Sequence, residues 1–188
     1  MTRQQTALVV SNSEKFNVLV KRVLSDLRFS AVEIRKSAAS ARSELLARSY
    51  NIIIVYSPLP DELGVDFVMD VKAKYSSGVV LVMPNEIYDD VTDHVIDHGV
   101  ATVHKPVSRI TLSRRIRLMA AMQNEMFETH KKIESVKEKM EEIRIVSKAK
   151  CLLIEKRGMT EDEAHRYIGK MAMDHDVSRR KVAEEIIG

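Results

Sequence analysis

The chain has 188 residues, of which 45% are hydrophobic and 30% charged, a composition that excludes a disordered chain and predicts a folded domain plus a smaller one. No apolar run approaches the roughly 20 residues that a membrane helix needs, and "MTRQQTALVV" has no signal-peptide pattern. The single cysteine, Cys151, cannot form a disulfide within the chain. We therefore expect a cytoplasmic protein without disulfides. The net charge of +3 is uneven, because residues 1–105 sum to −1 and residues 106–188, with 18 Lys/Arg and 14 Asp/Glu, sum to +4; the second part is the better candidate for a polyanion partner.

Short apolar runs and amphipathic stretches alternate through the first part of the chain. The runs predict strands at 6–10, 30–35, 51–56, 78–83 and 99–104, and the stretches between them predict helices at 13–27, 39–50, 64–75 and 85–98, with Ser13 and Asn85 as N-caps. Such alternation predicts an α/β fold with a five-stranded parallel doubly wound sheet. Ligands bind such sheets at the carboxyl ends of the strands.

Residues 6–118 resemble the receiver domain of bacterial response regulators. The resemblance rests on the strand–helix rhythm and on three strings: "SPLPDELG" after the third strand, "DHG" before the fifth and "HKPV" after it. It implies a flavodoxin-like fold with an acidic pair for Mg²⁺, a phosphate-accepting aspartate, a Thr or Ser and a lysine at the strand ends. At those positions this chain has Ser11, Asn12, Tyr56, Met83 and Lys105, so only the lysine is present.

We therefore expect a degenerate receiver that is not phosphorylated on aspartate and needs no cofactor or metal. Tyr56 is expected to cap the empty pocket, with tyrosine phosphorylation as the alternative. Lys105 is expected to bond strand-end carbonyls. Asp61 and Glu62 lie beyond two prolines and are expected to face solvent rather than replace the missing acids.

A long helix is predicted from an N-cap at Ser108 to a C-terminal Gly158, because no Pro or Gly interrupts this stretch. Apolar residues recur in it at heptad spacing, which favours a coiled coil and a homodimer. The alternative is a single helix packed on its own receiver. The predicted dimerisation residues are Met119, Met122, Met126, Ile133, Val136 and Met140.

Two short helices are predicted after Gly158. Thr160 and Glu163 form a capping-box pattern before the first, and Asp176 or Ser178 caps the second. With the end of the long helix they predict a small three-helix bundle. Cys151 occupies an apolar position and is expected to be packed.

Residues 136–188 resemble the ANTAR domain, the RNA-binding module of bacterial antitermination regulators. The resemblance rests on "KAKCLLIEKRGMTEDEAHRYIGKMAM" and "VAEEII". Cys151, Leu153 and Gly169 depart from the family pattern. The resemblance implies a dimer that binds paired hairpins in nascent mRNA leaders and prevents terminator formation.

RNA contacts of this kind require Lys or Arg for phosphates and an aromatic ring for splayed bases. The candidate ring is Tyr167, with core packing as its alternative, or His165. The candidate basic residues are Lys148, Lys150, Arg157, Arg166, Lys170, Arg179, Arg180 and Lys181, among which Lys150 matches the family motif.

The sequence thus predicts three parts: a degenerate receiver-like domain at 1–107, a coiled-coil linker helix at 108–142 and an ANTAR RNA-binding domain at 143–188. The predicted function is RNA-binding transcription antitermination controlled independently of aspartate phosphorylation, with a sensor or regulatory protein as input. The alternative is a protein-interaction regulator whose receiver and coil surfaces dock a partner, with weak or no RNA binding. No motif indicates an enzyme.

Overall fold

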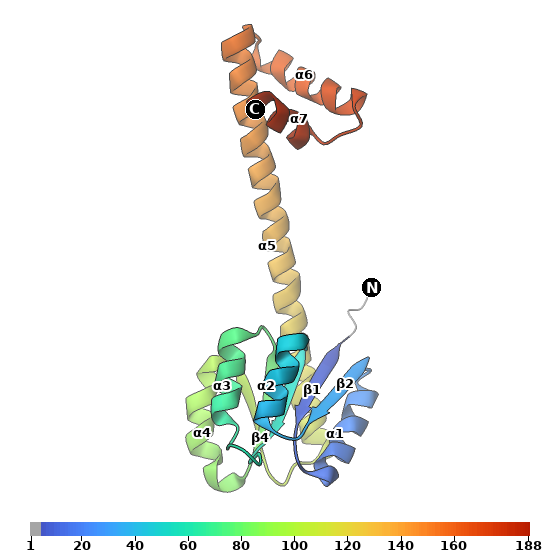
Figure 1. The fold of residues 1–188 in the computed structure, drawn as a ribbon, viewed down its shortest axis with the longest axis vertical. Coiled ribbons are helices and arrows are strands. Elements are labelled where there is room, and N and C mark those ends of the chain that lie inside the picture. The colour runs from blue at the N-terminus through green and yellow to red at the C-terminus, as the bar shows by residue number, and fades with distance from the viewer. Residues whose placement is uncertain (1–4) are drawn as a thin grey trace. The chain divides into compact units, whose positions relative to one another are not determined.

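A computed structural model describes residues 5–188 (Figure 1). The chain divides into two compact units, a receiver-type unit that ends at Met126 and a helical unit that starts at Phe127. This division falls inside the predicted linker helix, so the three-part division at 107 and 142 stays a prediction. None of the helices in the described range combines the length and the apolar character that crossing a bilayer requires.

The receiver-type unit is a parallel sheet with helices on both faces, which confirms the predicted fold class. The strand order is β2-β1-β3-β4-β5, and every neighbouring pair is parallel. Its elements are β1 (Thr6–Val10), α1 (Glu14–Asp26), β2 (Ala31–Arg35), α2 (Ala38–Ala47), β3 (Ile52–Tyr56), α3 (Val65–Lys74), β4 (Gly78–Met83), α4 (Tyr88–Val95), β5 (Val100–His104) and the first part of α5 (Arg109–Arg157).

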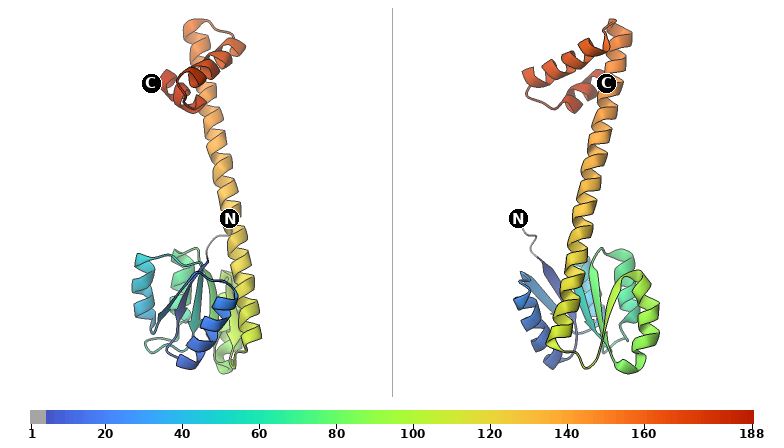
Figure 2. Two further views of the ribbon diagram at one scale, coloured as in Figure 1. Left: turned by 90° about the vertical axis from the view of Figure 1, so that its right-hand side faces the viewer. Right: turned by 180° about the vertical axis from the view of Figure 1, so that it is seen from behind.

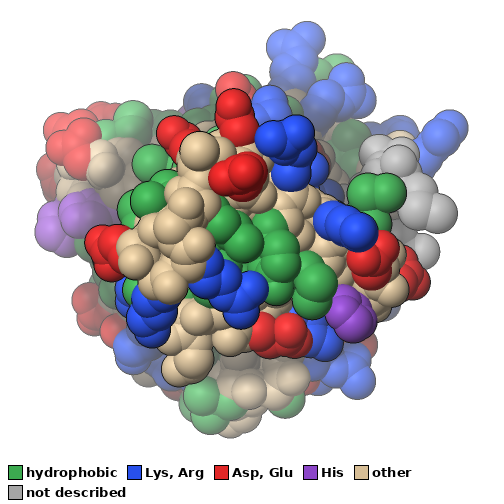
Figure 3. All heavy atoms as spheres, turned by 90° about the horizontal axis from the view of Figure 1, so that it is seen from above, with side chains coloured by type: hydrophobic (Ala, Val, Ile, Leu, Met, Phe, Trp, Pro, Cys, Tyr) green, Lys and Arg blue, Asp and Glu red, His purple; other side chains and the backbone are tan. Residues whose placement is uncertain are grey.

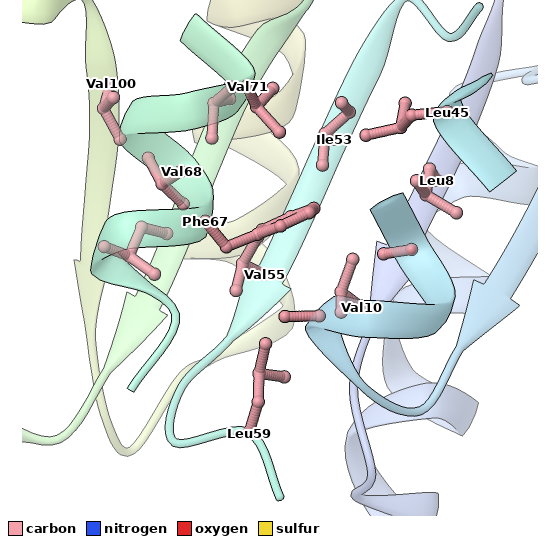
Figure 4. Close-up of a cluster of buried hydrophobic side chains, with 14 of the residues drawn as sticks. Leu8, Val10, Leu45, Ile53, Val55, Leu59, Phe67, Val68, Val71 and Val100 are labelled. Carbon is pink, nitrogen blue, oxygen red and sulfur yellow. The ribbon is translucent and has the colours of Figure 1, made fainter. Parts of the chain in front are cut away.

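Two hydrophobic cores form because successive strand residues point to opposite faces of the sheet. Leu8, Ile53 and Val55 face α2, α3 and α4, where Phe67 of α3 is fully buried among them (Figure 4). The alternate residues, such as Val9 and Ile54, face α1 and α5. Figure 2 shows α1 and the start of α5 on one face and α2 and α3 on the other.

The first turns of α5 belong to the second core. Ser108 caps the helix as predicted, since its hydroxyl accepts the N–H of Thr111 at 3.1 Å. Leu112 and Ile116 are fully buried against the sheet. The helix passes so close to β4 that a Cβ at Gly78 would lie 2.9 Å from the side chain of Gln123.

The helices of this unit differ from the expected ones in two places. Residues 85–98 form a 3₁₀ turn (Asn85–Ile87), α4 and a second 3₁₀ turn (Ile96–His98), so Asn85 starts a tight turn and gives no side-chain cap. The helix expected to reach residue 50 ends at Ala47, because the buried Tyr50 turns back and donates its hydroxyl proton to Glu44 at 2.6 Å. Burial and this carboxylate raise the pKa of Tyr50 to about 12.

The helical unit consists of the last part of α5, α6 (Glu161–Asp174) and α7 (Arg179–Ile187). Helix α5 ends at Gly158, which adopts a left-handed φ of 66° as the predicted C-terminal residue. The capping box is confirmed, because Thr160 and Glu163 each bond the other's backbone N–H, and Ser178 rather than Asp176 caps α7. The core of the bundle is made of Ala149, Leu153, Ala164, Ile168, Ala172, Val182 and Ala183.

The attachment of α5 to the sheet gives a first prediction. We expect Ile116→Ala to lower the free energy of unfolding of the receiver-type unit by about 2–5 kcal/mol, since it empties a fully buried site. Leu118→Ala, two residues further on the same helix where the side chain is 52% exposed, is the matched control and should cost well under 1 kcal/mol. Urea unfolding followed by circular dichroism measures both; equal losses would contradict the assigned packing.

Candidate functional site

The carboxyl ends of β1, β3 and β5 hold an aromatic stack where a receiver carries charged groups. The ring of Tyr56 stacks on that of Phe16 with centroids 4.2 Å apart and planes at 25°. The ammonium of Lys105 lies 3.6 Å from the centroid of the Tyr56 ring and donates a hydrogen bond to the carbonyl oxygen of Ser57. The predicted hydrogen bond from Lys105 to a strand-end carbonyl is confirmed, whereas the role of Tyr56 as the cap of an empty receiver pocket stays a prediction.

The environment of Lys105 is electrostatically unusual. Burial lowers the pKa of its ammonium, because a charged form loses hydration there. The ring face and the Ser57 carbonyl supply negative electrostatic potential in place of the carboxylates that a receiver would provide. Both the Ser57–Pro58 and the Lys105–Pro106 peptide bonds are cis.

The other predicted site positions do not form an ion-binding cluster. Ser11 is fully buried and its hydroxyl accepts the N–H of Ser13, Asn12 is exposed, and Met83 lies in the core on the opposite face of the sheet from Tyr56. Within residues 5–188 no group of three or more His, Cys, Asp or Glu side chains is placed to hold a metal ion. These residues offer no carboxylate to Mg²⁺ and no aspartate to a phosphodonor.

Asp61 and Glu62 were expected to face solvent, and this expectation was wrong in part. The exposed Asp61 accepts the N–H groups of Ala38 and Ala39 at 3.0 and 2.9 Å, and these bonds hold the pKa of its carboxyl below the usual range. Glu62 pairs with Arg42 at 2.8 Å. Both acids stabilise the ends of helices and do not substitute for the missing ones.

The helical unit presents a basic groove where α5 ends and α6 begins. We call it the α5–α6 groove; its volume is about 510 Å³, and it is lined by Arg157, Gly158, Met159, Glu163, Arg166, Tyr167 and Lys170. Three of these residues are basic. The one carboxylate, Glu163, is engaged in the capping box. Figure 3 views this end of the unit and shows Lys and Arg side chains among acidic ones around a hydrophobic patch.

Tyr167 joins the groove to the core of the bundle. Its ring packs partly against the core, and its hydroxyl accepts a hydrogen bond from Arg157 at 3.1 Å. It also lines an adjoining cavity of about 260 Å³ with Lys156 and Arg157. Lys156, which the sequence reading missed, borders the same surface and directly precedes Arg157 in the chain.

The remaining predicted RNA-binding residues lie apart from the groove. Lys150 is only 19% exposed and pairs with Glu161 at 2.8 Å, so it ties α5 to the start of α6. Its hydrogen bond lowers the pKa of Glu161. Lys148 lines a separate cavity of about 330 Å³, and Arg180 pairs with Glu184 at 2.8 Å.

Two residues that depart from the ANTAR pattern have distinct environments. Gly169 lies beside Arg179, and a Cβ added there would make an ordinary van der Waals contact with the Arg179 guanidinium at 3.7 Å. Cys151 was expected to be packed, and this was wrong, because its side chain is exposed on α5. The bundle is instead closed by Ala149 and Leu153 on the other side of the helix.

The predicted dimerisation residues also separate into two groups. Met119 is 5% exposed and packs in the receiver-type unit's own core, as the alternative of a self-packed helix predicted for this part of α5. The other five are exposed side chains at spacings of three, four or seven residues: Met122, Met126, Ile133, Val136 and Met140.

Comparison with known proteins identifies both units. The ANTAR domain family model matches residues 134–187. Transcriptional regulatory protein PdtaR of Mycobacterium tuberculosis is 28% identical over 138 residues, which cover 73% of this chain and 67% of that protein. The aliphatic amidase regulator of Pseudomonas aeruginosa is 30% identical over 95 residues, which cover 48% of this chain and 45% of that protein.

Solved structures resemble the receiver-type unit in fold. A signal receiver domain of an HD domain-containing protein from Pseudomonas fluorescens has a TM-score of 0.60 at 21% identity, covering 68% of this chain and 95% of that one. A CheY-like response regulator receiver domain protein from Methanospirillum hungatei has a TM-score of 0.59 at 18% identity, covering 66% and 99%. The chain thus carries an ANTAR domain, C-terminal to a domain with the receiver fold.

Proposed function

We propose that this chain is a transcription antitermination regulator that binds paired hairpins of nascent mRNA as a dimer and is controlled without aspartate phosphorylation. The ANTAR domain supports the general part of this function, an RNA-binding regulator of antitermination. The observation that carries the finer part is the basic α5–α6 groove. Its Arg157, Arg166 and Lys170 surround a half-buried tyrosine on one surface.

The groove has the chemistry that a hairpin loop requires. Arg166 and Lys170 are one helical turn apart and exposed, so they are positioned for neighbouring phosphates. Tyr167 and the Arg157 guanidinium beside it offer flat surfaces on which an unpaired base stacks. Lys148, Arg179 and Arg180 extend the basic surface, and Lys150 acts on RNA mainly by holding α5 and α6 together through Glu161.

The dimer is proposed to form through the apolar stripe of α5. We call this stripe the α5 seam and define it as Met122, Met126, Ile133, Val136, Met140 and Ile143, which are 46–66% exposed. An apolar row of this length on a soluble helix is stable when a second helix covers it. Two copies would bring two grooves to two hairpins, so that RNA binding gains from bivalency.

The receiver-type unit is proposed to receive an input other than a phosphoryl group, through a sensor or regulatory protein. Its aromatic stack at Tyr56 keeps the scaffold folded without the ion-binding carboxylates. We assign it no catalytic step, because its residues supply neither a nucleophilic aspartate nor Mg²⁺ ligands.

The groove predicts an RNA-binding defect. We expect Arg166→Ala with Lys170→Ala to weaken binding to a two-hairpin leader RNA at least tenfold and to reduce the salt slope of the affinity by about 1–2, since two phosphate contacts are lost. Lys21→Ala with Lys36→Ala, which removes two exposed charges from the receiver-type unit, is the control and should change neither. Gel-shift titrations at several salt concentrations measure the RNA affinity and its salt slope. Equal effects of the two pairs of substitutions would refute the assignment of RNA binding to the α5–α6 groove.

The aromatic stack at Tyr56 predicts that phosphodonors do not modify the protein or change its RNA binding. Acetyl phosphate with Mg²⁺ should leave the intact mass of the protein and its RNA affinity unchanged. Tyr56→Asp alone should not become phosphorylated, because Ser11 and Asn12 provide no carboxylate for the ion. A stable phosphoryl adduct on the unaltered chain would contradict the proposal.

The α5 seam predicts a monomerising substitution. Val136→Glu places a charge in the middle of the seam and should shift the full chain from dimer to monomer in sedimentation experiments. Ser135→Glu adds the same charge one residue earlier, away from the seam, and should leave the dimer intact. If Ser135→Glu dissociates the chain as well as Val136→Glu does, the seam is not the interface.

A further inference from the structure

From residue 132 to residue 144 the α5 seam is bordered on both sides by basic residues. At 100° per residue, Lys132 and Lys139 lie along one border of the seam, and Lys137 and Arg144 lie along the other. All four side chains are exposed. Glu134 and Glu138 lie toward the back of the helix, whereas Glu125, one heptad before Lys132, is an acidic residue on the border of the seam. Arg144 has Glu141 at 3.8 Å, but an exposed pair at that distance has little effect on its charge.

These borders oppose the pairing of two identical helices. In a parallel two-stranded coil each residue of the border that holds Lys132 and Lys139 faces the residue five positions later in the second copy. Lys132 would face Lys137, and Lys139 would face Arg144, so both contacts join like charges. The apolar seam therefore favours a homodimer and its borders weaken it.

We propose that the α5 seam is also the docking site for an amphipathic helix of another protein that carries Asp or Glu on both borders of its own apolar stripe. Such a helix offers apolar contacts to Ile133, Val136 and Met140 and opposite charges to all four basic residues. It replaces the second copy, so that binding of the partner separates the dimer. The inference rests on the proposed dimer seam and is independent of RNA binding.

The apolar centre of the seam favours a helix rather than a nucleic acid as the binding partner. Val136 and Met140 are 56% and 66% exposed between the basic borders. RNA would neutralise the borders through its phosphates but would leave this apolar surface facing a charged backbone. A helix with apolar and acidic residues satisfies both at once.

Synthetic peptides test the proposal on the full-length chain. The probe is a fluorescent peptide of about four heptads with Ile and Leu on its stripe and Glu on both borders, and its partner probe has Lys in place of Glu. Fluorescence anisotropy should show the Glu peptide binding at least tenfold tighter at low salt, with the advantage shrinking as salt is raised. Sedimentation should show the Glu peptide converting the homodimer into a complex with one chain. Equal binding of the two peptides, or binding of neither, overturns the proposal.

A charge exchange on one border gives the sharper test. Lys132→Glu with Lys139→Glu turns both like-charge contacts of the homodimer into opposite-charge contacts. The homodimer should become about tenfold tighter, and the Glu peptide should lose its advantage. Lys131→Glu, on the side of the helix opposite the seam, is the control and should change neither. A homodimer that tightens equally in the control would overturn the assignment of the borders.

The salt dependence of the homodimer and the binding of RNA distinguish a failure of this inference from a failure of the proposed function. Salt should strengthen the homodimer of the unaltered chain, because it screens its like charges, and should weaken RNA binding. Absence of RNA binding with retained selectivity for the Glu peptide would contradict the proposed function and leave this inference intact. RNA binding without selectivity between the two peptides would contradict this inference and leave the proposed function intact.

Discussion

Helix α5 supplies buried side chains to one core of the receiver-type unit and to the core of the helical unit, and this constraint governs the rest of the molecule. Leu112 and Ile116 close one face of the receiver-type sheet, and Ala149 and Leu153 close the bundle of the helical unit. Between these anchors Val136 and Met140 are 56% and 66% exposed. In the proposed dimer a second helix covers this exposed seam.

The strand ends of the receiver-type unit show how a binding site can be lost while its scaffold stays folded. A receiver concentrates carboxylates there, which must repel one another unless an ion is bound. Here the stack of Phe16, Tyr56 and Lys105 fills the space with an aromatic pair and a single cation. The cation lies over a ring face and donates a hydrogen bond to a carbonyl oxygen.

Periodicity and capping patterns were enough to predict the sheet, the long helix and the capping box at Thr160. Side-chain partners could not be predicted in this way. The pairing of Lys150 with Glu161 joins two helices across a turn, and the exposure of Cys151 depends on which face of α5 the bundle covers. Met119 obeys the heptad pattern yet is buried in its own unit, because the same spacing serves a core and a seam.

The most direct test of the account is a transcription assay in vitro on a template whose leader encodes two adjacent hairpins and a terminator. Read-through is measured against the concentration of the full-length chain, with and without acetyl phosphate and Mg²⁺. The account predicts that read-through rises with protein, requires both hairpins and does not depend on the phosphodonor. Read-through that appears only with the phosphodonor, or that persists after one hairpin is deleted, would contradict it.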